Sequence, residues 1–253
     1  MTNAGVILTR HQRGLHRHFG TWWAPNASAD GSSMGAKWTG QGTVTHPAPA
    51  NTNAATQLRC TMWANAAANT DVGLRCNDAS DLQFWAGNAI GLGGWYFAAT
   101  FRIETWFANS GRLFVGMCNS NTGQVVNDVF SATDVIGLWH DTTMGANVLK
   151  LAARKNGVNG TFIDFTTFTL AAGQAFRFEM SQPGNFEAAG ETCQVRAVLT
   201  SINTGDSSRQ LAIFGDAYRN TVFLAPQVQV SSGADATANR FAIGVANVYV
   251  SGL

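Results

Sequence analysis

Carboxylates are the side chains of this sequence best suited to acid–base chemistry, and their spacing argues against a hydrolase. Hydrolysis of a glycosidic bond needs two carboxyl groups, about 5 to 9.5 Å apart. Residues i and i+2 of a strand share a face, so a pair at that spacing would meet the need. No such acidic pair occurs, and Glu104 and Glu179 each follow an arginine by two positions instead. That spacing predicts surface ion pairing rather than catalysis, and we expect no enzyme activity.

Other reactive groups give equally little support for catalysis or for a cofactor. The sequence has no Gly-x-Ser-x-Gly elbow, no phosphate-binding loop and no dinucleotide fingerprint. The only His–Asp pair in the core region, His140-Asp141, falls at a strand end, where Asp commonly caps the backbone. Neither the aspartates nor the cysteines are spaced as metal ligands, so we expect no metal and no cofactor. Cys60 and Cys76 could form a disulfide, although free buried thiols are the more common state.

Tryptophan offers a different chemistry, the stacking of a flat ring on a sugar. The chain has 8 tryptophans, and a sugar site needs such a ring beside polar donors and acceptors. Packing in a core or subunit interface is the commoner role for any single tryptophan. The candidates for glycan contact are Trp85, Trp106, Trp139, His140 and Asp141.

The first 20 residues differ from the rest of the chain, because they are basic and lack strand periodicity. We expect residues 1–20 to form an arm that docks on a partner protein, since arginine pairs well with carboxylates and stacks on aromatic rings. A solvated terminal tail is the alternative. The expected docking residues are Arg10, Arg13, Arg17, Phe19, Trp22 and Trp23.

The elements that must position these groups are strands. Phe97, Ala99, Phe101 and Ile103 alternate with polar or small residues at a period of two, and similar runs recur to the C-terminus. Asn156-Gly157 and Asn159-Gly160 stand between such runs, as in β-hairpins. Only a short turn of helix is expected, within 211–220. The sequence thus predicts an all-β, two-sheet antiparallel sandwich formed by one domain, residues 21–253.

The amino-acid composition is typical of that fold and argues against some classes of binding partner. Of 253 residues, 45% are hydrophobic and 12% charged, with a formal net charge of +1. So little charge indicates neither nucleic acid nor an anionic membrane as partner, and no run of apolar residues is long enough to insert. Aromatic content is high for a surface with so little charge, which favours a homo-oligomer.

The order of the strand-like runs resembles a known family. The runs are residues 94–103, 111–116, 135–141, 175–180, 224–228 and 241–250. Their order and style over residues 60–253 resemble the concanavalin-A-like jelly-roll sandwich of tailed-bacteriophage fibres and other virion surface proteins. The resemblance lies in strand order and not in a diagnostic motif.

The resemblance implies a non-catalytic structural protein on the virion surface. The main expectation is a tail-fibre or tail-tip adhesin that binds the host surface, with a host glycan as the expected ligand, as a homotrimer alongside other virion proteins. A capsid decoration or head-fibre protein is one alternative. A carbohydrate-binding lectin or glycosidase-like protein unrelated to bacteriophage is the other.

Overall fold

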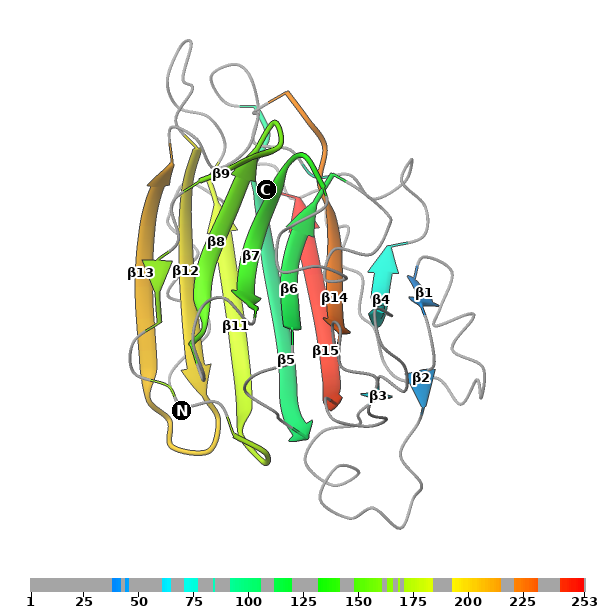
Figure 1. Ribbon diagram of the computed structural model, residues 1–253. Coiled ribbons are helices and arrows are strands. Elements are labelled where there is room, and N and C mark those ends of the chain that lie inside the picture. The colour runs from blue at the N-terminus through cyan, green and yellow to red at the C-terminus, as the bar shows by residue number, and fades with distance from the viewer. Residues whose placement is uncertain are drawn as a thin grey trace.

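Two antiparallel sheets make up the described part of the chain (Figure 1). The computed structural model describes residues 38–41, 44–45, 61–64, 71–76, 84, 92–105, 112–119, 132–141, 148–160, 163–165, 168, 171–183, 193–214, 221–231 and 242–252. Within these ranges every element is a strand, and none is a helix that could span a membrane. The prediction of an all-β, two-sheet antiparallel jelly roll is therefore confirmed.

One sheet, called sheet A here, has eight strands in the order β1-β4-β14-β6-β7-β8-β10, with β9 paired to β8. Its strands are β1 (Trp38–Gln41), β4 (Asp71–Cys76), β14 (Ala225–Ser231), β6 (Arg112–Cys118), β7 (Val135–His140), β8 (Lys150–Lys155), β9 (Val158–Asn159) and β10 (Ile163–Asp164).

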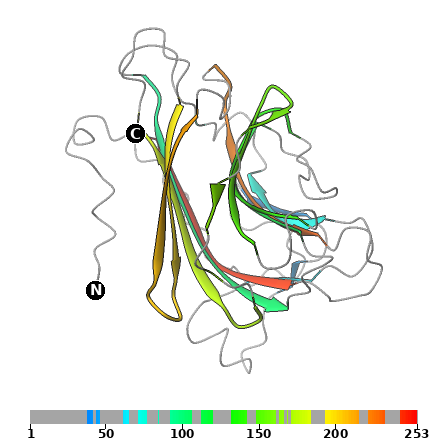
Figure 2. The same ribbon diagram turned by 60° about the vertical axis from the view of Figure 1, so that its left-hand side comes forward.

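The other sheet, sheet B, has seven strands in the order β13-β12-β11-β5-β15-β3-β2. Its strands are β13 (Ser207–Phe214), β12 (Cys193–Ser201), β11 (Ala175–Gln182), β5 (Trp95–Thr105), β15 (Ala242–Gly252), β3 (Thr61–Ala64) and β2 (Val44–Thr45). Figure 2 shows both sheets curved the same way and nested, so that the outer face of sheet A is concave.

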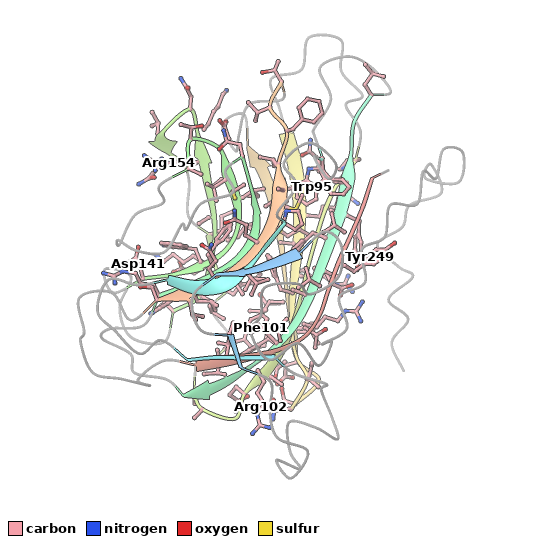
Figure 3. All side chains as sticks on the ribbon, turned by 90° about the vertical axis from the view of Figure 1, so that its right-hand side faces the viewer. Trp95, Phe101, Arg102, Asp141, Arg154 and Tyr249 are labelled. Atoms are coloured by element: carbon pink, nitrogen blue, oxygen red, sulfur yellow. The ribbon has the colours of Figure 1, made fainter. Side chains whose placement is uncertain are left out.

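The period-two alternation predicted for β5 places one face of the strand in the core. Phe97, Phe101 and Ile103 are each fully buried in the main hydrophobic cluster, between the sheets. Tyr96 and Arg102 face the other way and are half-buried. Figure 3 shows Phe101 between the sheets and Tyr249, from the neighbouring β15, on the outer side of sheet B. Burial of the apolar face at about 25 cal/mol per Å² is what fixes the register of these strands.

The hairpin predicted at Asn156-Gly157 is confirmed. Both residues have positive φ, 50° and 81°, as a tight turn between β8 and β9 requires. After this hairpin, Ile163–Asp164 form the short strand β10 and pair with β8.

The helical turn expected within 211–220 is wrong for its first part. Residues 211–214 continue β13 and pair with β12 up to Phe214, opposite Cys193. Pairing with a neighbouring strand outweighs the local sequence signal there. The remaining positions, 215–220, lie outside the described residues.

Sheet A differs from the expected half-buried pattern, since both faces of its central strands are buried. Every residue of β6, β7 and β14 is buried, including Gln227 and Gln229. A second apolar cluster lies on the concave side, formed by Phe114, Cys118, Ala132, Val135, Trp139 and Ala152. The concave face is therefore not an open solvent face.

Candidate functional site

Trp139, His140 and Asp141 were candidates for glycan contact, and all three are buried. Trp139 is 1% exposed and its indole Nε1 donates a hydrogen bond to Asp141 Oδ2 at 2.9 Å. His140 Nδ1 donates to the carbonyl of Val148 at 2.7 Å, since a carbonyl can only accept. These contacts correct the expectation of a stacking platform here, because a ring that is covered on both faces cannot lie against a sugar.

On the concave face beside Trp139, β6 and β7 approach each other closely at a pair of glycines, and an aromatic ring covers that place. Gly116 and Gly137 pair across β6 and β7, and the Phe114 ring lies over both. A Cβ built on Gly137 would lie 2.7 Å from the Val115 carbonyl oxygen and 2.8 Å from the Phe114 ring. Phe114 in turn meets Trp139 edge to face, with ring centroids 6.1 Å apart. The glycines therefore serve ring packing rather than flexibility.

Polar side chains gather at one end of sheet A, where β6 ends and β7 begins. Asn119 Nδ2 donates to Thr133 Oγ1 at 2.7 Å, and Thr133 Oγ1 donates to Asp134 Oδ2 at 3.2 Å. Asp134 Oδ1 accepts from the backbone N–H of Asn156 at 3.3 Å. The Asp134 N–H donates back to Asn119 Oδ1 at 3.0 Å, so the four residues form one connected network.

We call this end of sheet A the rim, meaning Asn119, Thr133, Asp134, Asn156 and Phe223. Asp134 is fully buried, whereas Thr133 and Asn156 are exposed. Phe223 is 47% exposed and lies two residues before Ala225, which pairs with Cys118 next to Asn119. Figure 1 shows β14 beginning at the end of sheet A where the β8–β9 hairpin also lies. The rim thus combines an exposed aromatic residue, just before β14, with hydroxyl and carboxamide groups at the end of the neighbouring β6 and at the start of β7, which a buried carboxylate holds in place.

A second polar cluster lies on the outer face of sheet B. Tyr96 donates its hydroxyl proton to Glu179 Oε1 at 2.5 Å, and Arg177 pairs with the same oxygen at 3.1 Å. Burial, the hydrogen bond and the charge of Glu179 together raise the pKa of Tyr96. Burial is the largest single influence on Arg177 and lowers its pKa, but the charge of Glu179 and the hydrogen bonds to Tyr96 and Glu179 together outweigh burial and raise the pKa of Arg177. The ion pair predicted for Arg177 and Glu179 is present, with Glu179 far less exposed than a surface pair would be.

The three buried carboxylates among the described residues, Asp134, Asp141 and Glu179, are not paired with one another. Asp134 and Asp141 flank opposite ends of β7, roughly 23 Å apart at 3.3 Å per residue. Glu179 lies on the other sheet with Tyr96 and Arg177. Among the described residues no cluster of His, Cys, Asp and Glu could hold a metal ion.

Several candidates from the sequence lie outside the described residues. These are residues 1–20 with Arg10, Arg13, Arg17 and Phe19, the pair Trp22 and Trp23, and also Trp85 and Trp106. The possible disulfide between Cys60 and Cys76 is also outside the described part of the structure, because Cys60 is not among the described residues. Cys118 is a free, buried thiol. The rim was missed because Asn119, Thr133 and Phe223 carry no motif, and only the strand pairing brings them together.

Comparisons of the sequence with known proteins return no relative. No family model matches the chain, and no curated protein matches it either. The concanavalin-A-like resemblance therefore has no support in residue identity, and these sequence comparisons do not bear on its bacteriophage part.

Solved structures, in contrast, match nearly the whole chain. Winged bean acidic lectin, complexed with methyl-α-D-galactose, has a TM-score of 0.59 at 10% identity, over 92% of this chain and 97% of the lectin. Lectin I-B4 from Griffonia simplicifolia has a TM-score of 0.58 at 12% identity, over 92% and 99%. A protein of unknown function from Shewanella oneidensis has 0.58 at 9%, over 92% and 86%. Identities this low speak for fold and not for ligand, and the chain is accordingly a concanavalin-A-like jelly-roll sandwich of the architecture seen in these lectins.

Proposed function

We propose that this protein is a non-catalytic carbohydrate-binding module whose glycan contact is the rim. The observation that carries the proposal is the exposed Phe223 ring beside the network of Asn119, Thr133 and Asp134. A sugar ring presents an apolar C–H face and a set of hydroxyls, so it requires a ring and fixed polar groups side by side. The lectin architecture of the solved neighbours adds support to this assignment.

Pre-organisation of the rim is the physical reason to expect useful affinity. The Asn119 and Thr133 side chains are held by the buried Asp134, so a ligand need not order them. Thr133 Oγ1 accepts a hydrogen bond from Asn119 and donates one to Asp134, so its position at the exposed edge of the rim is fixed before a ligand arrives. The Asn156 side chain, at the exposed tip of the hairpin, supplies further carboxamide groups nearby.

The test uses the full chain with immobilised neutral sugars, namely galactose, glucose and mannose, followed by titration with the free sugar. We expect binding to at least one of them and a loss of about fivefold or more in Phe223→Ala, since an aromatic stack contributes around 1 kcal/mol or more. Ile202→Ala is the matched control, because Ile202 is 48% exposed in the turn after β12, at the other end of the sandwich (Figure 1). Absence of neutral-sugar binding, or equal loss in both variants, would overturn the proposal.

A place on a bacteriophage particle remains a second, finer proposal. Its support is the order of strand-like runs over residues 60–253, and glycan binding is the activity that a host-recognition protein needs. In this proposal the protein is a homo-oligomer, a trimer by expectation, on the virion surface, with residues 1–20 docked on another virion protein. Deletion of residues 1–20 should leave a folded protein that fails to enter particles, and normal assembly of the truncated chain would contradict the docking role.

A further inference from the structure

The outer face of sheet B carries arginine on four adjacent strands. Arg209 lies on β13, Arg196 on β12, Arg177 on β11 and Arg102 on β5. Arg196 and Arg209 are exposed, the Arg177 side chain is 41% exposed, and Arg102 is half-buried. Glu179 is the one carboxylate among the described side chains of this face. The described side chains of this face therefore carry three more positive than negative charges, although the whole chain has a net charge of only +1.

Strand register places these arginines along a diagonal. Arg196 lies opposite Ser181 of β11, and Arg102 lies opposite Ala175 of the same strand. Two strand spacings and six residue positions separate Arg196 from Arg102, which corresponds to roughly 20 Å. Arg177 falls between them on β11, and Arg209, on the edge strand β13, lies opposite Val198, two positions along β12 from Arg196. We call this row the arginine diagonal.

Glu179 shows which ligand group the face can hold. Its carboxylate accepts hydrogen bonds from Tyr96 at 2.5 Å and from Arg177 at 3.1 Å. The Tyr96 and Tyr249 rings lie next to each other, with centroids 5.9 Å apart, on the same side of the sheet. Guanidinium groups pair bidentately with carboxylates, and phenol rings pack against sugar faces. We infer that the outer face of sheet B is a docking surface for a polyuronate, a polysaccharide with one carboxylate on each sugar.

The side chains between the arginines favour a polyuronate over a protein as the partner of this face. Ser181, Thr200 and Thr100 occupy the neighbouring outward positions, and Val198 is the largest described aliphatic side chain among them. A protein interface needs a buried apolar centre, which this row does not offer. A linear polyanion needs only spaced charges along an exposed face, and the register spaces these arginines roughly 8 to 14 Å apart from one strand to the next. The inference is independent of the rim, which lies at the end of sheet A.

The test measures binding of the full chain to a polygalacturonate oligomer of about ten sugars, by calorimetry at low and high salt. Fully methyl-esterified polygalacturonate is the matched neutral probe. We expect binding that weakens with salt, that is lost with the ester, and that falls roughly two- to fivefold for each arginine removed in Arg196→Gln combined with Arg209→Gln. Lys155→Gln on sheet A removes a positive charge elsewhere and should change little.

Each alternative outcome would overturn the inference in a distinct way. No binding to polygalacturonate, or equal binding to its ester, would mean that the arginines do not bind the carboxylates of this polymer. Equal loss in Lys155→Gln makes the attraction non-specific. Tighter binding to dextran sulfate, to duplex DNA or to an acidic protein replaces the polyuronate with that partner. Phe223→Ala should retain polygalacturonate binding, so failure here and failure of the neutral-sugar proposal are told apart.

Discussion

Trp139 and Asp141 are joined by a hydrogen bond from the indole Nε1 to Oδ2 at 2.9 Å, and both side chains are buried. The hydrogen bond joins Trp139, near the end of β7, to Asp141, the first residue after the strand. This end of β7 is the one farther from the rim. A tryptophan held in this way is a structural residue, since its only polar atom already has a partner within the protein.

The first prediction therefore concerns stability. Trp139→Phe keeps a ring in the second apolar cluster but leaves the buried Asp141 carboxylate without this donor, which should lower the free energy of unfolding by about 2 kcal/mol. Asp141→Asn retains an acceptor and should lower it less. Urea denaturation followed by circular dichroism measures both. Loss of sugar binding in Trp139→Phe with no loss of stability would return this ring to the glycan site.

The second prediction tests the close approach of β6 and β7. Gly137→Ala places a Cβ against the Val115 carbonyl and the Phe114 ring, and backbone cannot give way cheaply. We expect a loss of about 2 kcal/mol or more, as for other overpacked core positions. Gly205→Ala is the control, because a Cβ there meets nothing within 4 Å and only its φ of 79° is unfavourable, by about 1 kcal/mol. Equal losses in the two variants would mean that contact with Phe114 is unimportant.

The third prediction is a pH dependence from Tyr96. Its pKa is raised in the folded protein above the ordinary value near 10, by burial first and then by Glu179. The raised pKa gives a stability contribution that is full below about pH 10 and is lost as the pH rises toward the folded-state value. Denaturation curves between pH 8 and pH 11.5 should show this decline in the unmodified protein and a weaker one in Tyr96→Phe. Parallel curves for the two proteins would contradict it.

The sequence was sufficient for the fold because burial of alternate residues has a simple period. Phe97, Phe101 and Ile103 could be assigned to one face of a strand from spacing alone, and Asn156-Gly157 to a turn from its tolerance of positive φ. The sequence was insufficient for Trp139, because the covering of the concave face depends on distant segments. A tryptophan in an alternating strand carries no local sign of which face remains open.

The rim and the arginine diagonal escaped prediction for a related reason. Asn119 and Thr133 are 14 positions apart, and Tyr96 and Glu179 are 83 apart, so only strand pairing makes neighbours of them. Four arginines on β13, β12, β11 and β5 look like ordinary solvated residues one strand at a time. Their alignment is a property of the register, which depends on hairpins and core packing together.

The last prediction separates the two roles of the rim, support and contact. Asp134 is fully buried and serves Asn119, Thr133 and the Asn156 N–H, so Asp134→Ala should lower the free energy of unfolding by about 3 kcal/mol through unsatisfied donors. It should also weaken neutral-sugar binding, because the side chains that meet the ligand lose their anchor. Thr133→Val removes a hydroxyl that bonds both Asn119 and the buried Asp134, so it should weaken binding and lower the free energy of unfolding by about 1 kcal/mol, less than Asp134→Ala does. Thermal denaturation and sugar titration on the same samples measure both effects. If Asp134→Ala lost stability yet bound sugar as tightly as the unmodified protein, the network would be a hairpin support alone and the glycan contact would have to lie elsewhere.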